Sequence, residues 1–170
     1  RASSSKFDEC FEDALAEIQE QAGAQQNTLL GFQTGLRYKV LSRSEACFLL
    51  RKCESLLSSG ETKADDDLWL EHICPQSWDN DPQPIGWGHI EWSEYNNLLN
   101  RLGNLTLLLK EPNIEASNKP WNDKKEIYKR ESTLNINNTD NLTSFSEWND
   151  KSIKARSDIL AKVLYDNLTL

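Results

Sequence analysis

Glu71 and His72 are adjacent residues of this sequence that could do chemistry together. A carboxylate is a ligand for a hard cation such as Mg²⁺, and histidine changes its charge near neutral pH, so it can take a proton from water. Neighbours on a strand point to opposite faces, but at the end of a strand two such side chains can flank one bound phosphate. The pair therefore suits hydrolysis of a phosphodiester, although a Glu beside a His is more often an ordinary surface pair.

Three motifs, the first of which contains this pair, resemble those of an HNH endonuclease. They are Glu71-His72-Ile73-Cys74-Pro75-Gln76-Ser77, then Leu102-Gly103-Asn104-Leu105-Thr106-Leu107-Leu108, then Asn113 and Asn118-Lys119-Pro120-Trp121-Asn122-Asp123-Lys124. More narrowly, residues 65–165 resemble the C-terminal nuclease domain of GmrSD-type modification-dependent restriction enzymes and related phage-defence proteins. The closing pattern also resembles that group: Trp148, Ile153, Arg156 and Leu160.

The resemblance implies a role for each matching residue. His72 would be the general base, and Asn104 would hold the loop and orient that histidine through hydrogen bonds. Glu71 and Asn113 would be ligands of one divalent ion, with Asn118 as the alternative to Asn113. Carboxylate and amide oxygens favour Mg²⁺ or Mn²⁺ over zinc. Such a domain nicks DNA and leaves a 5′-phosphate and a 3′-hydroxyl, in an antiviral restriction protein.

DNA, the substrate, would be held by positive side chains near the site, namely Lys119, Lys124, Lys125 and Lys129. At helical spacing Lys125 and Lys129 share a face, although a solvated helix face would have the same pattern. The net charge of −8 argues against a general nucleic-acid coat protein. Two alternatives stay open: an HNH-like binding or interaction module with weak catalysis, and a nuclease that cuts RNA. The resemblance also implies an N-terminal nucleotide-hydrolysing sensor domain in the same longer protein.

The elements that position these residues follow from the hydrophobic pattern. Apolar residues at helical spacing predict a helix over 7–22, one from a cap at Ser44 to residue 57, one after a cap at Ser93, one from Pro120 to Arg130, and one after Asn149 or Asp150. Short apolar runs predict strands at 68–73 and 104–109. Residues 27–43 have no clear pattern, and 131–147 are predicted to form a loop.

The resemblance makes the two strands and a short helix carrying Asn113 a ββα-metal (HNH) core. The predicted fold class is therefore mainly α with a small β-hairpin, in which this core is embedded in a helical domain. We expect a helical lead-in at 1–62, the nuclease core at 63–130, and a loop and C-terminal helix packing on it at 131–170. The 170 residues contain no methionine, even at the first position, which indicates a piece of a longer protein.

Cellular location is predicted from what the sequence lacks. No apolar run is long enough to span a membrane, and the first residues do not form a secretory signal. The cysteines lack the spacing of a zinc knuckle and are predicted to be buried free thiols, as in a reducing cytoplasm: Cys10, Cys47, Cys53 and Cys74. A bacterial cytoplasmic protein is expected.

Overall fold

The computed structural model describes residues 28–58, 68–76, 92–130, 134–138 and 142–167. Within 92–130, side chains are described from Tyr95 onward. In chain order the elements are α2 (Leu29–Tyr38), α3 (Arg43–Leu57), β1 (Leu68–His72), α4 (Trp92–Leu99), the 3₁₀ turn η3 (Leu102–Asn104), β2 (Leu105–Leu109), α5 (Lys110–Ala116), α6 (Trp121–Arg130), the 3₁₀ turn η4 (Asn135–Asn137) and α7 (Asp150–Tyr165). A mainly α fold with one small hairpin is thereby confirmed. The helix predicted over 7–22 lies outside the described residues, as does Cys10.

A two-stranded antiparallel sheet positions the candidate catalytic residues. β1 pairs with β2 so that Glu71 faces Thr106 and His72 faces Leu105. Both strands were predicted from their apolar runs. α5 begins at Lys110, directly after β2, so the chain has the strand–strand–helix order expected of a ββα unit.

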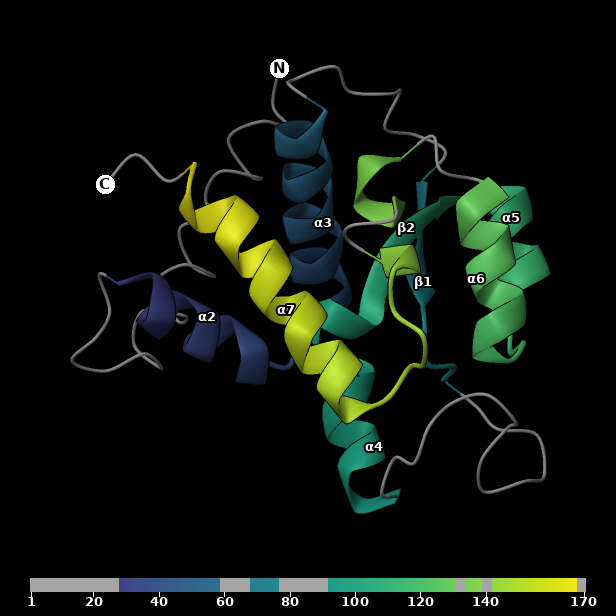
Figure 1. The fold of residues 1–170 in the computed structure, drawn as a ribbon, viewed down its shortest axis with the longest axis horizontal. Helices are drawn as coiled ribbons and strands as arrows, with labels where there is room; N and C mark the ends of the chain where they lie inside the picture. The colour runs from purple at the N-terminus through teal and green to yellow at the C-terminus, as the bar shows by residue number, and fades with distance from the viewer. Residues whose placement is uncertain (1–27, 59–67, 77–91, 131–133, 139–141, 168–170) are drawn as a thin grey trace.

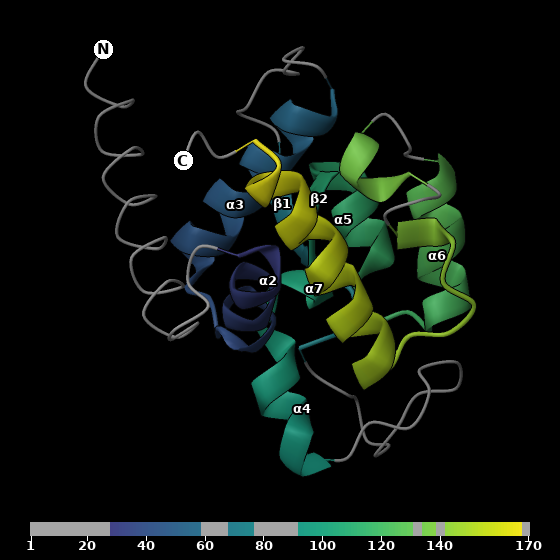
Figure 2. The same cartoon turned by 60° about the vertical axis from the view of Figure 1, so that its left-hand side comes forward.

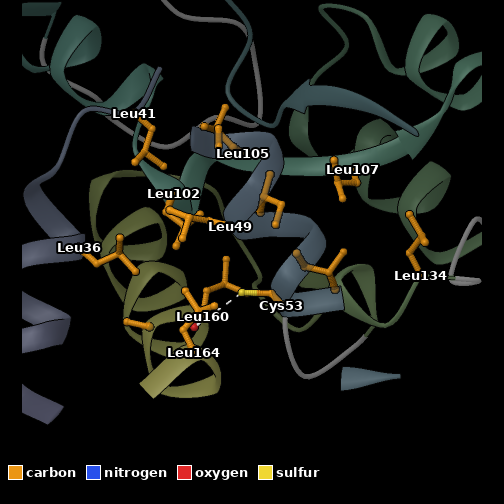
Figure 3. Close-up of a cluster of buried hydrophobic side chains, with 14 of the residues drawn as sticks. Leu36, Leu41, Leu49, Cys53, Leu102, Leu105, Leu107, Leu134, Leu160 and Leu164 are labelled. Atoms are coloured by element: carbon orange, nitrogen blue, oxygen red, sulfur yellow. Dashed lines mark hydrogen bonds between the residues drawn. The ribbon is translucent and has the colours of Figure 1, made fainter. Parts of the chain in front are cut away.

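Helices cover this hairpin on two sides. Figures 1 and 2 both show α7 between α2 on one side and the α5–α6 pair on the other. One apolar cluster joins α2, α3 and α7 to β2, and Figure 3 shows its leucines together with Cys53. A second cluster lies around Trp121 and Trp148, whose ring centroids are 4.8 Å apart. The hairpin is therefore fixed between two separate parts of the core.

α7 is also hydrogen-bonded to the turn that enters β2. Arg156 is fully buried and donates from Nη1 to the carbonyl oxygens of Gly103 (3.0 Å) and Leu105 (2.6 Å). Gly103 N donates to Ser157 Oγ at 3.0 Å. A Cβ on Gly103 would lie 1.9 Å from the carbonyl oxygen of Ile153, so only glycine fits here. The close approach of α7 thus explains why residue 103 is a glycine.

Two features of the first helices differ from the prediction. α2 was not predicted because Gly31 and Gly35 lower its helix propensity, yet both glycines are buried in the fold. α3 is capped by Ser42 instead of Ser44. Ser42 Oγ accepts from the backbone of Glu45, and the Glu45 side chain accepts from the backbone of Ser42, which is a complete capping box.

The described cysteines are free thiols, as predicted, but Cys47 is only partly buried where a buried thiol was expected. Cys47, Cys53 and Cys74 form no disulfide, and Cys53 and Cys74 are buried. None of the helices in the described ranges has the length and apolarity needed to cross a membrane.

Candidate active site

An open pocket of about 410 Å³ lies at the end of β1, where α5 passes beside the strand. Four of the residues predicted for the site line it: Glu71, His72, Asn113 and Asn118. The pocket wall is completed by Leu70, Pro75, Gln76, Ile114 and Ser117. Residues from two distant parts of the sequence thus meet in one solvent-accessible hollow.

Glu71 is the most tightly held side chain of this pocket. Its Oε1 accepts from Lys124 Nζ at 2.6 Å and from the Tyr128 hydroxyl at 2.9 Å. Its Oε2 accepts from Asn113 Nδ2 at 3.1 Å. Lys124 Nζ also donates to the backbone oxygen of His72 at 2.7 Å, so α6 holds both residues at the end of β1.

Burial dominates the electrostatics of this group. It raises the pKa of Glu71 and lowers the pKa of Lys124, while their mutual contact opposes both shifts. Burial also lowers the pKa of His72 below its ordinary value of 6.5; the hydrogen bond to Asn100 opposes this, and the positive charges of Lys124 and Arg43 add to it. His72 is consequently neutral at neutral pH, as a general base must be.

Two side-chain amides, those of Asn100 and Gln76, contact the ring of His72. His72 Nε2 lies 3.0 Å from Asn100 Oδ1 and 3.3 Å from Gln76 Nε2. Asn100 follows α4 directly, and its backbone oxygen accepts from Leu41 N at 2.9 Å. The imidazole is half-buried, and it borders the pocket.

Asn104 braces the chain that follows His72. Its Oδ1 accepts from Cys74 N (2.9 Å) and from Trp148 Nε1 (3.0 Å), and its Nδ2 donates to the carbonyls of Cys74 (3.3 Å) and Leu99 (3.0 Å). Four hydrogen bonds satisfy every donor and acceptor of this fully buried amide. Asn104 thus holds the loop, whereas Asn100 is the asparagine that contacts the ring of His72.

Over residues 24–163 of its 170, the chain matches the family described as GmrSD restriction endonucleases, C-terminal domain. This range includes the whole pocket and the hydrogen bonds that frame it. The chain belongs to this family. The resemblance to the GmrSD C-terminal domain is thereby confirmed, and the chain is a nuclease domain of the restriction-endonuclease type. No curated protein and no solved structure matches it.

The donor atoms of this GmrSD C-terminal domain suit a hard cation better than zinc. Within the described ranges, no group of three or more His, Cys, Asp and Glu side chains could hold a metal ion. Mg²⁺ needs no such cage, because it keeps several waters and takes one or two protein carboxylates. Glu71 with the amides of Asn113 and Asn118 offers this kind of partial ligand set.

The lysines predicted to bind DNA have different surroundings. Lys124 is buried against Glu71 and is not on an exposed face. Lys125 Nζ donates to the carbonyl of Phe145 at 2.6 Å. Lys119 is partly exposed and Lys129 is exposed, and each pairs with a glutamate of a neighbouring turn. Only these last two present their charge to solvent as predicted.

Sequence reasoning did not give a site role to Asn100, Tyr128 or Trp148. Tyr128 lies four residues after Lys124 on α6, so helical spacing could have placed both on one face. Asn100 and Trp148 have no such signal, since their partners are 28 and 44 residues away along the chain.

Proposed function

We propose that this domain is a divalent-metal-dependent HNH nuclease that nicks DNA, with His72 as the general base. The observation that carries the proposal is that Glu71, His72 and Asn113, whose types and order resemble an HNH motif, line one open pocket. They reach it from β1 and α5, which have the order of a ββα unit. His72 borders the pocket in the neutral state that proton abstraction requires.

Glu71 and Asn113 would hold Mg²⁺ or Mn²⁺. Asn113 Nδ2 bridges two oxygens, Glu71 Oε2 at 3.1 Å and the carbonyl of Leu70 at 3.4 Å. A half-turn of this amide would exchange its nitrogen for its oxygen and leave three oxygens facing one another, a set of ligands that suits a hard cation. Asn118 lines the same pocket and is the second choice of ligand.

These placements support the following reaction. Neutral His72 takes a proton from a water molecule, and the resulting hydroxide attacks phosphorus in line with the leaving 3′ oxygen. The P–O3′ bond breaks, and the 3′ oxygen gains a proton from solvent. When bound, the divalent ion supplies the positive charge that stabilises the charged phosphate of the transition state. The Lys124–Glu71 pair fixes the end of β1 during this step, and the products are a 5′-phosphate and a 3′-hydroxyl.

DNA would be held by Lys119, which follows the pocket residue Asn118, and by the exposed Lys129 of α6. Lys119 and Lys129 lie on the segment from the end of α5 through α6, and phosphates would replace their glutamate partners. The DNA site would be selected by the N-terminal nucleotide-hydrolysing domain expected in the longer protein. We propose that this longer protein acts in the bacterial cytoplasm as an antiviral defence.

Nicking of supercoiled plasmid in Mg²⁺ or Mn²⁺ tests the proposal. His72→Ala should abolish nicking while its unfolding transition stays close to that of the parent. His89→Ala, the matched change at the chain's other histidine, should keep nicking. Equal nicking by His72→Ala and the parent would refute the proposal. Absence of nicking in the parent with either metal, on DNA and on RNA, would favour the binding module.

A further inference from the structure

Two side-chain amides approach Nε2 of His72, and they require opposite protonation states of that nitrogen. Asn100 presents its Oδ1, an acceptor, at 3.0 Å from Nε2, so this contact needs a proton on Nε2. Gln76 presents its Nε2, a donor, at 3.3 Å, so that contact needs a lone pair there. One neutral imidazole cannot satisfy both contacts as they stand.

Distance and support favour the contact with Asn100. The 3.0 Å separation lies within the usual range of N–H···O hydrogen bonds, about 2.7–3.2 Å, and the Gln76 separation lies beyond it. Gln76 is exposed, whereas Asn100 is half-buried. The backbone of Asn100 is fixed by Leu41, and Arg101, the next residue, donates to the carbonyls of Asn97 (2.6 Å) and Arg37 (2.8 Å).

We propose that Asn100 is a positioning residue that fixes His72 as the Nε2–H tautomer, which makes Nδ1 the basic atom of the ring. The second nitrogen of a working histidine is commonly held in this way, because its partner sets both the tautomer and the ring orientation. The proposal rests on the proposed function for its catalytic consequence, but the tautomer itself is a property of the folded domain. Asn100 thus fixes the ring of His72, whereas Asn104 fixes the loop that follows it.

Long-range ¹H–¹⁵N NMR spectra of the ring nitrogens test the tautomer directly. The chain has two histidines, so His89→Ala leaves the signals of His72 alone. At about pH 8, above the ordinary histidine pKa of about 6.5, we expect Nε2 to show the shift of a protonated nitrogen and Nδ1 that of an unprotonated one. The reverse pattern would overturn the proposal, since it would mean that an amide donates to Nε2.

Three variants separate positioning from folding. Asn100→Asp keeps an acceptor and should keep the Nε2–H signals, whereas Asn100→Leu should give averaged ring signals. Asn97→Ala, a matched change at an exposed asparagine of α4, should alter neither signals nor nicking. If Asn100→Leu is folded and its ring signals equal those of the parent, the proposal is wrong.

The nicking rate gives an independent readout. Asn100→Leu should lower kcat by about ten- to a hundredfold with little change in KM, because the ring is misoriented while the DNA contacts remain. An unchanged kcat in a variant with averaged ring signals would also contradict the proposed role. If the parent has the predicted tautomer and does not nick, the proposed function fails and the tautomer assignment stands.

Discussion

Lys124 and Glu71 form a buried ion pair in which Nζ lies 2.6 Å from Oε1 and the two side chains are 1% and 7% exposed. Removing two charges from water is costly. The cost is offset here because the other donors and acceptors of the two side chains also form hydrogen bonds. Lys124 donates to the backbone of His72, and Glu71 accepts from Tyr128 and Asn113. The pair therefore links α6 and α5 to the end of β1 that borders the pocket.

Lys124→Met is expected to lower the free energy of unfolding by about 3–5 kcal/mol, because it leaves Glu71 buried without a counter-charge. Urea unfolding followed by tryptophan fluorescence measures this loss. The double variant Glu71→Gln with Lys124→Met should recover most of the stability, since no unpaired charge remains.

Lys129→Met is the matched control for that experiment. Lys129 lies on the same helix and also pairs with a glutamate, but both side chains are exposed. Its substitution should change stability by no more than about 0.5 kcal/mol. Equal effects at the two lysines would show that the Lys124–Glu71 pair adds nothing beyond an ordinary surface pair.

The elements with a strong local signal were predictable. β1 and β2 are short apolar runs, α6 follows Pro120, and α7 begins after the Asn149 cap. α2 was not predicted, because two glycines oppose helix formation locally, and burial in the core outweighs this cost. Its signals were present in the sequence: Phe32 and Leu36, both buried, are one helical turn apart, and Thr28 caps the first turn.

The candidate site was predictable in part. The motif resemblance predicted that Glu71, His72 and Asn113 would share a pocket, and the structure has them in one. It could not show that Lys124 turns inward, because a lysine within a charged run has the same local pattern whether it is solvated or buried. The contact of Asn100 with His72 was also unpredictable, since the two residues are 28 positions apart in the chain and meet only through the fold.

Gly103→Ala should destabilise the domain by about 3 kcal/mol or more, because the new methyl group would meet the Ile153 carbonyl oxygen at 1.9 Å. That oxygen belongs to the backbone of α7 and cannot move like a side chain. Thermal unfolding by circular dichroism measures the effect. Ala116→Gly, which removes a buried methyl group without a clash, is the comparison, and a smaller loss at Gly103 than at Ala116 would contradict the close approach.

Divalent ions should raise the unfolding temperature of the domain if Glu71 and Asn113 hold them. Ligand at a hundred times its dissociation constant adds about 2.7 kcal/mol to stability. We expect Mn²⁺ to stabilise the parent and Asn118→Ala, and to lose its effect on Glu71→Gln and Asn113→Ala. Differential scanning calorimetry with and without Mn²⁺ measures this. Loss at Asn118→Ala with retention at Asn113→Ala would transfer the ligand role to Asn118.

Acid should weaken both stability and nicking through His72. Burial holds the pKa of His72 below 6.5 in the folded domain, so between that lowered pKa and 6.5 the unfolded chain binds the proton first. The stability contributed by neutral His72 is therefore complete above pH 6.5 and is lost as pH falls through the folded pKa. Nicking rates at saturating metal, measured from about pH 5 to 8, should fall with a midpoint below 6.5.

Arg43 gives this pH dependence a specific test. Its positive charge helps to lower the pKa of His72, and it lies exposed at the start of α3. Arg43→Gln should therefore move the acid limb of the rate toward higher pH, whereas Lys52→Gln, at an exposed position later in α3, should leave it in place. A bound divalent ion acts in the same direction as Arg43, so comparing the variants at equal metal occupancy isolates the arginine. An acid limb that His72→Gln leaves unchanged would show that another group controls the pH dependence.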